Sequence, residues 1–179
     1  MPKHQGELDG LCGPYAIANA LEHCGLENCK PEAVFQSACS ALARRRWPRV
    51  LWKGATFSDL QRMIKRCQRD IPAMNRVSVT YPFMKHPPAN NDSYWKRFDA
   101  LFEEETPGVR CAIIGVTRPS NHWIVASRDG SRIQLIDCVH GASNRRKNRK
   151  SFYAGKRCAD PNKWLIDRQE LVLIETDAN

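Results

Sequence analysis

The spacing of apolar residues changes along the chain, from a helical pattern before Val109 to a strand-like pattern after it. Apolar residues recur every three or four positions in segments that begin near Cys12, Pro31, Thr56 and Tyr94. After Val109, short apolar runs alternate with turn residues, as in an antiparallel sheet. Helices followed by such a sheet indicate the α+β class, with an N-terminal helical half packed on a C-terminal antiparallel β-sheet.

We expect the second helix, which Pro31 opens, to fail near Trp47-Pro48. Strands are predicted over residues 76–81, 111–116, 122–126, 132–137, 164–166 and 171–174, with a polar, basic loop over 143–160. The length of 179 residues suits a single domain, residues 1–179, with a sizeable core. The chain starts without a signal-peptide pattern and lacks the ~18-residue apolar run that crosses a bilayer, so we expect a cytoplasmic protein.

The first helical segment carries a cysteine at its start. Pro14 is tolerated only in the first turn of a helix, and Gly25 is a favoured residue just past a helix end. Cys12 therefore lies at or immediately before the helix N-terminus. Unpaired N–H groups and the positive end of the helix dipole stabilise a thiolate there, so we predict that Cys12 is a nucleophile.

A predicted β-hairpin brings a histidine and an aspartate together. A two-residue turn at Asp129-Gly130 places residues whose numbers sum to 259 opposite each other, as His122 and Asp137 do. The same face, predicted to pack against the helix that carries Cys12, would hold Ile124, Ala126, Ile133 and Leu135. In this arrangement His122 takes the thiol proton and later gives it to the leaving group, while Asp137 orients the imidazole.

Acyl transfer also needs donors for the oxyanion that forms on the substrate. The backbone N–H of Cys12 is one candidate. The side-chain amide of Gln5, seven residues upstream, is a second, and the N–H groups of the turn around Asp9-Gly10 compete with it.

Three features together resemble the papain-like cysteine peptidases: Cys12-Gly13-Pro14 before a small-residue helix, His122-Trp123 opening a strand, and Leu-Ile-Asp137 ending the next. Within that family they are most similar to the bacteriocin-processing, double-glycine-cleaving peptidases. The resemblance implies a papain-like fold, a triad of Cys12, His122 and Asp137, and an oxyanion-hole glutamine that falls on Gln5. The segment before Cys12 also looks like the Josephin-type and ovarian-tumour-type deubiquitinases, which implies a ubiquitin-like substrate as an alternative.

These features predict a cysteine peptidase or hydrolase that cleaves a peptide or isopeptide bond through an acyl-enzyme on Cys12. The expected partner is a protein or peptide substrate. Transglutaminases and acyltransferases use the same triad with an amine or another acceptor in place of water. The sequence does not separate hydrolysis from transfer.

The net charge of +9 is concentrated in basic clusters. The clusters are Arg44-Arg45-Arg46, Lys65-Arg66 with Arg69, and the segment from Arg145 to Lys150. In an enzyme, Arg145, Arg146 and Lys147 are predicted to bind an acidic substrate, because their segment begins eight residues past Asp137. A basic nucleic-acid-binding module without catalysis is the alternative from a different class.

The eight cysteines lie mostly in apolar, periodic segments, which favours reduced core thiols over a disulfide framework. The sequence has no C-x-x-C pair, and Cys24 and Cys29 with His23 lack a second pair at the spacing that zinc requires. We therefore predict neither a metal nor a cofactor.

Overall fold

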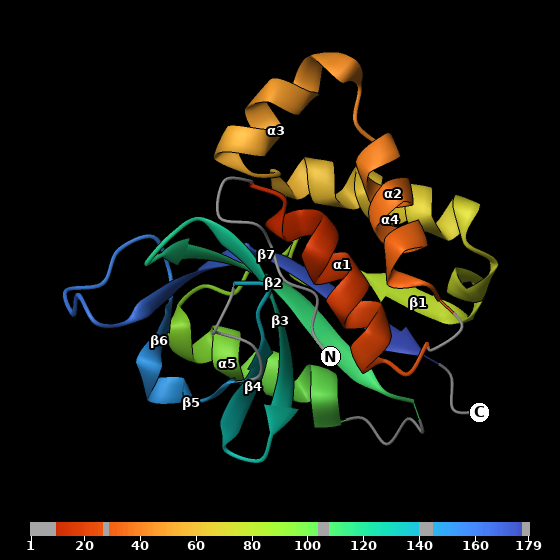
Figure 1. Ribbon diagram of the computed structural model, residues 1–179. Helices are drawn as coiled ribbons and strands as arrows, with labels where there is room; N and C mark the ends of the chain where they lie inside the picture. The colour runs from red at the N-terminus through yellow and green to blue at the C-terminus, as the bar shows by residue number, and fades with distance from the viewer. Residues whose placement is uncertain (1–9, 27–28, 104–107, 140–144, 177–179) are drawn as a thin grey trace.

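The computed structural model describes residues 10–26, 29–103, 108–139 and 145–176, which form an α+β fold as predicted (Figure 1). The helices are α1 (Cys12–His23), α2 (Pro31–Ser40), α3 (Trp47–Lys53), α4 (Phe57–Asp70) and α5 (Asn91–Glu103), with 3-10 turns at Arg44–Arg46, Pro72–Arg76 and Arg149–Ser151. The strands are β1 (Val77–Thr80), β2 (Arg110–Arg118), β3 (His122–Asp129), β4 (Arg132–Ile136), β5 (Arg145–Asn148), β6 (Phe152–Ala154) and β7 (Trp164–Thr176).

The strands form one sheet in the order β1-β7-β2-β3-β4-β5, and β6 pairs with β7. Neighbouring strands are antiparallel except for β6 and β7, which are parallel. The long strand β7 replaces the two separate strands predicted over 164–166 and 171–174. The predicted basic loop also contains structure, because its residues 145–148 pair with β4 as an edge strand.

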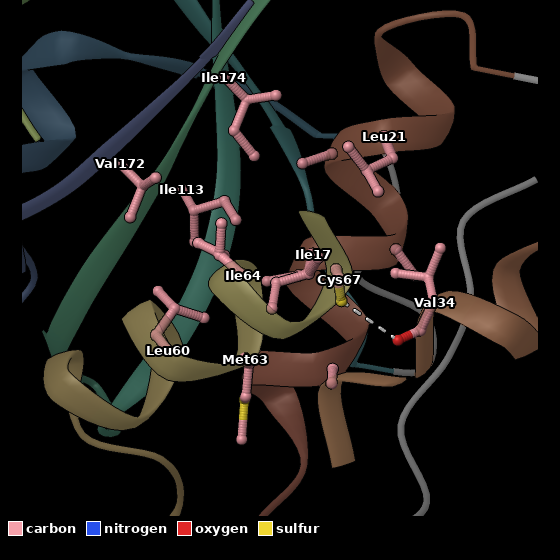
Figure 2. Packing of buried hydrophobic residues seen from close by; sticks show 14 of the residues in the cluster. Ile17, Leu21, Val34, Leu60, Met63, Ile64, Cys67, Ile113, Val172 and Ile174 are labelled. Carbon is pink, nitrogen blue, oxygen red and sulfur yellow. Dashed lines mark hydrogen bonds between the residues drawn. The ribbon is translucent and has the colours of Figure 1, made fainter. Parts of the chain in front are cut away.

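Two hydrophobic clusters cover the two faces of the sheet. One joins α1, α2 and α4 to residues such as Ile113, Val125 and Val172, and Figure 2 shows part of it. The other joins the aromatic residues of α5 to the opposite face. The sheet is therefore buried on both sides, which explains why β3 is apolar at consecutive positions.

The predicted packing face of the β3–β4 hairpin is wrong. Ile124, Ala126, Ile133 and Leu135 pack in the cluster of α5, whereas Trp123 and Val125 face the cluster of α1. The sequence pattern could not separate the two faces of the sheet. Because α5 covers the face opposite to α1, the residues on both faces are apolar.

The predicted hairpin turn is also shifted by one residue. Ala126 pairs with Leu135 and Asp129 with Arg132, so the turn consists of Gly130 and Ser131. The strict pairing of His122 with Asp137 is therefore wrong. A one-residue shift of the turn changes every partner by two positions, which keeps the same side chains on the same face. β3 and β4 pair only as far as Val125 and Ile136, so the contact between His122 and Asp137 is made by side chains beyond the last paired residues of the hairpin.

The helical half differs from the prediction at Trp47-Pro48. These residues begin α3 instead of ending the preceding helix, which has already stopped at Ser40. Proline fits the first turn of a helix because its missing N–H would have no intrahelical partner there. The extra helix matters for the site, because Leu51 of α3 accepts a hydrogen bond from the N–H of Gly10, two residues before Cys12.

Candidate active site

Cys12 is the first residue of α1, as predicted, and Gly25 follows the helix with a positive φ of 76°. Leu11 is the N-cap residue, and its carbonyl accepts the Tyr15 N–H at 3.2 Å. The N–H groups of Cys12 and Gly13 belong to the first turn, where the helix itself offers no acceptor. The Cys12 sulfur thus lies at the positive end of the helix dipole.

Close packing fixes Gly10, two residues before Cys12. The Gly10 N–H donates to the Leu51 carbonyl at 2.6 Å. A Cβ added at Gly10 would lie 2.7 Å from the Val50 oxygen and 2.8 Å from the Gly54 nitrogen, so this position admits no side chain. Gly13 approaches the same connection, because its Cβ would lie 3.2 Å from the Cβ of Ala55. The start of α1 is therefore held against the end of α3.

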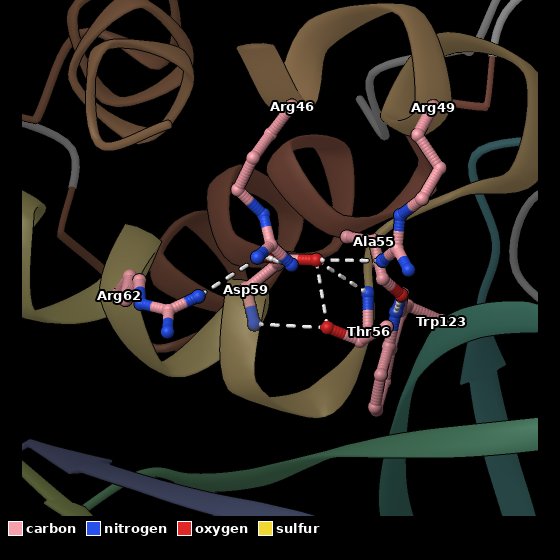
Figure 3. Close-up of polar contacts among 7 residues, drawn as sticks. All are labelled: Arg46, Arg49, Ala55, Thr56, Asp59, Arg62 and Trp123. Carbon is pink, nitrogen blue, oxygen red and sulfur yellow. Dashed lines mark hydrogen bonds and ion pairs between the residues drawn. The ribbon is translucent and has the colours of Figure 1, made fainter. Parts of the chain in front are cut away.

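A buried carboxylate organises the connection between α3 and α4 (Figure 3). Asp59 is 0% exposed, and with Thr56 it forms a capping box at the start of α4. Arg46, Arg49 and Arg62 approach its oxygens at 2.7, 3.2 and 3.3 Å. Burial raises the pKa of Asp59, but hydrogen bonds from Thr56 and Arg46 outweigh this effect and place the pKa below its ordinary value.

His122 and Asp137 are in direct contact. His122 is the first residue of β3, Asp137 follows β4, and Nε2 of the imidazole lies 2.6 Å from Oδ1 of the carboxylate. The same carboxylate oxygen accepts the Val139 N–H at 3.0 Å, which fixes its orientation. Because Nε2 is bonded to Asp137, Nδ1 is the ring nitrogen that remains for another partner.

The imidazole of His122 is stabilised in its charged form. Burial lowers the pKa of His122, but hydrogen bonds with Asp137, Cys12 and Cys138, together with the charge of Cys12, raise it to about 12. Cys12 is thus one of the groups whose charge favours the imidazolium form of His122. A thiol, an imidazole and a carboxylate in this order are the groups that a thiolate–imidazolium pair requires.

Cys12 and His122 line one cavity of about 270 Å³. Its other lining residues are Arg49, Lys53, Gly54, Ala55, Thr56, Gly115, Val116, Thr117, Asn121, Trp123, Asp167 and Glu170. Of the eight cysteines of the chain, Cys12 is the one that lines this cavity. The cavity gives a substrate access to a sulfur that is otherwise buried.

Cys138 was not singled out by the sequence, although it directly follows Asp137. Its Sγ lies 3.8 Å from Nε2 of His122, and burial raises the pKa of its thiol. One ligand atom each from His122, Asp137 and Cys138 falls within 4.8 Å of the others. A tetrahedral zinc ion separates bound nitrogen and oxygen atoms by roughly 3.3 Å. The 2.6 Å contact is therefore a hydrogen bond that leaves no space for an ion between its atoms.

The predicted substrate-binding residues Arg145, Arg146 and Lys147 lie on β5 and are not among the residues that line the cavity. Arg146 forms an ion pair with Asp129 at 2.8 Å, and Nζ of Lys147 lies 4.7 Å from the ring centre of Trp164. Their contact with substrate stays a prediction and concerns a surface outside the cavity.

Several basic residues of the helical half form ion pairs with acidic side chains. Besides the arginines around Asp59, Arg66 and Arg69 both pair with Asp70. These ion pairs reduce the free positive charge on which the nucleic-acid alternative depends.

Two residues predicted to contribute to the oxyanion site lie outside the described residues: Gln5, and Asp9 of the Asp9-Gly10 turn.

Within the described part of the chain, no helix is both long and apolar enough to cross a membrane. No protein-family model matches the sequence, and no curated protein matches it either. Among solved structures, the chain matches the peptidase domain of Streptococcus ComA, which is described as a bi-functional ABC transporter involved in a quorum sensing pathway. The match covers 98% of this chain and 96% of that domain, with a TM-score of 0.52 and 11% sequence identity. At this identity the likeness shows the fold, so the chain has the fold of a peptidase domain.

Proposed function

We propose that the protein is a papain-like cysteine peptidase, with Cys12 as the nucleophile, His122 as the general base and acid, and Asp137 as the residue that orients the imidazole. The observation that carries the proposal is the 2.6 Å contact between His122 and Asp137 at a cavity that also exposes Cys12. The likeness in fold to a peptidase domain supports it.

The proposed reaction follows from these positions. The Cys12 thiolate attacks the carbonyl carbon of a peptide or isopeptide bond, and the backbone N–H of Cys12 donates to the resulting oxyanion. The His122 imidazolium gives its proton to the leaving amine, which breaks the C–N bond and leaves a thioester on Cys12. Water then attacks the thioester while His122 takes its proton, and the acid product leaves with the thiolate regenerated. Gln5 is proposed as a second oxyanion donor.

The test is alkylation with limiting iodoacetamide at pH 6, followed by intact mass. We expect a single fast adduct that disappears in Cys12→Ala and forms more slowly in His122→Ala, because a neutral thiol is a poor nucleophile. Cys39→Ala, which changes a half-buried cysteine outside the cavity, should keep the fast adduct. Slow labelling spread over several cysteines would overturn the proposal.

Hydrolysis is proposed in preference to acyl transfer, because the fold is that of a peptidase domain. The two reactions differ in the acceptor of the acyl group. Incubation with a peptide substrate, a labelled primary amine and ¹⁸O water separates them by product mass. Hydrolysis places ¹⁸O in the new carboxyl group, whereas a product that carries the amine label instead would indicate transfer.

A further inference from the structure

Strand β7 contains a bulge beside the candidate active site. Ile114 of β2 pairs with Leu171, but Val116 pairs with Ile166, so residues 167–170 of β7 have no regular partners opposite Gly115. Bulges of this kind redirect side chains out of the regular alternation of a strand. Here the bulge directs Asp167 and Glu170 to the cavity that Cys12 and His122 line.

A side chain of the bulge that does not line the cavity is bonded to the loop before α5. Arg168, which lies between the two acidic residues, donates from its guanidinium to the carbonyl oxygens of Pro88 and Ala89. Its side chain is therefore committed to the loop before α5. This anchor leaves Asp167 and Glu170 as the charged side chains that the bulge contributes to the cavity.

Glu170 lies directly over the backbone of β2. A Cβ added at Gly115 would overlap Oε2 of Glu170 and would lie 3.0 Å from its Cβ. Gly115 pairs with Trp123 on β3, and the next pair along the two strands is Val116 with His122. The carboxylate of Glu170 thus lies on the strand pair that carries His122, in space that only a glycine leaves open.

The two carboxylates have no cationic partner among the residues that the structure describes. Oδ1 of Asp167 accepts the Gln169 N–H at 2.8 Å, and no lysine or arginine of the described ranges comes within ion-pair distance of either side chain. Two cationic residues line the same cavity: Arg49, which is bonded to Asp59, and Lys53, which is not within ion-pair distance of either carboxylate. Burial and the nearby charge of Asp167 raise the pKa of Glu170 to about 7. A half-buried carboxylate without a partner is unfavourable, and a bound cation would relieve it.

We infer that this wall of the cavity binds a cationic side chain of the peptide substrate, a lysine or arginine near the scissile bond, with Glu170 as its main partner and Asp167 as the second. The inference rests on the proposed peptidase function and adds its substrate class. It assigns selectivity to the cavity wall formed by β7, which is separate from the surface of Arg145, Arg146 and Lys147.

The test compares two methanethiosulfonate reagents, one with an aminoethyl group and one with a methyl group. Each forms a mixed disulfide with the Cys12 thiolate and releases methanesulfinate, and peptide mapping measures the Cys12 adduct over time. We expect the cationic reagent to react faster than the neutral one, and Glu170→Gln to lower this rate ratio by about fivefold. Asp167→Asn should lower it by a smaller factor. Glu32→Gln, an exposed change on α2 outside the cavity, should keep the wild-type ratio.

The outcomes separate the inference from the proposed function. If iodoacetamide does not select Cys12, the peptidase function fails. If iodoacetamide selects Cys12 but the cation-to-neutral ratio is the same in the wild type and in Glu170→Gln, the inference alone is overturned. A wild-type preference for the neutral reagent also overturns it, and this measurement needs no variant. Cleavage of a randomised peptide library should then enrich lysine or arginine at one position, and enrichment of acidic residues there would contradict the inference.

Discussion

The indole N–H of Trp123 donates a hydrogen bond to the carbonyl oxygen of Ala55 at 2.8 Å. Trp123 follows His122 on β3, and Ala55 lies in the connection against which Gly13 packs. The indole ring also stacks on Phe57, the first residue of α4, with ring centroids 5.9 Å apart. One side chain therefore ties β3, which holds His122, to the α3–α4 connection, against which the start of α1 packs.

Replacing Trp123 with phenylalanine should weaken both stability and reactivity. The change leaves the Ala55 oxygen without its donor and removes part of a buried ring, at a cost of about 1–3 kcal/mol in the free energy of unfolding. We also expect slower alkylation of Cys12, since α1 and β3 lose a fixed spacing. Urea unfolding and the iodoacetamide rate measure the two effects. Trp52→Phe, at a tryptophan that is 74% exposed, should change stability by less than about 0.5 kcal/mol.

Asp137→Asn should change how stability depends on pH. Hydrogen bonding with Asp137 contributes to the rise of the His122 pKa from 6.5 to about 12, against the opposing effect of burial. A folded-state pKa above the unfolded value stabilises the protein fully below about pH 6.5 and loses this contribution progressively as the pH rises toward 12. The free energy of unfolding of the wild type should therefore fall more steeply between pH 7 and 10 than that of the variant, a range set by the same shift.

The control for this prediction is Asp129→Asn. Asp129 lies on the same hairpin but pairs with Arg146 at its surface. Its replacement should leave the slope of stability against pH unchanged in urea unfolding at pH 7, 8.5 and 10, values within the range of the His122 shift. Equal slopes for the wild type and Asp137→Asn would mean that the carboxylate does not hold the proton of His122.

The contact between His122 and Asp137 could be found from sequence even though the turn was placed one residue too early. Both residues lie at the same end of the hairpin, beyond the last β3–β4 pair of Val125 with Ile136, and a shift of one residue in the turn does not change this. The position of Cys12 was predictable for a similar reason, because Pro14 and Gly25 mark the two ends of the helix by local backbone chemistry.

Features that depend on distant pairing could not be predicted. The bulge at residues 167–170 exists because β7 pairs with β2, more than forty residues earlier in the chain, and nothing in the local sequence marks Glu170 as a cavity residue. The strand β5 has no apolar alternation, since its basic side chains lie at the edge of the sheet, where charge is tolerated. The packing face of β3 was ambiguous because helices cover both sides of the sheet.

Gly10→Ala should displace the start of α1, which carries Cys12. The new Cβ would meet backbone atoms of Val50 and Gly54, which cannot rotate away, so the loop or α3 must move. We expect a loss of about 2 kcal/mol or more in stability and slower alkylation of Cys12. Gly25→Ala is the matched control, because its φ of 76° costs strain while the space around it is open. It should lose about 1 kcal/mol and keep the wild-type alkylation rate. Unchanged alkylation in Gly10→Ala would show that this packing does not position Cys12.

Asp59 should make the protein sensitive to acid. Its pKa lies below the ordinary value of 3.8, because hydrogen bonds from Thr56 and Arg46 outweigh the effect of burial. A lowered folded-state pKa gives stability that is present above about pH 3.8 and is lost as the pH falls through the folded value. Asp59→Ala removes both the Asp59 half of the capping box and the carboxylate shared by three arginines, at a cost of about 3 kcal/mol at pH 7.

The two roles of Asp59 can be separated by Asp59→Asn, which keeps an acceptor for the cap but removes the charge. This variant should lose less stability than Asp59→Ala at pH 7, and its stability should fall less than that of the wild type between pH 5 and 3, around the ordinary pKa. Asp70→Asn is the comparison on the surface, since Asp70 pairs with Arg66 and Arg69 where solvent screens the charges. Because Thr56 and Ala55 are adjacent and both line the cavity, loss of the bonds between Asp59 and Thr56 should also slow alkylation of Cys12. A variant that loses stability but alkylates at the wild-type rate would show that Gly10 and Trp123 position the site without help from this capping box.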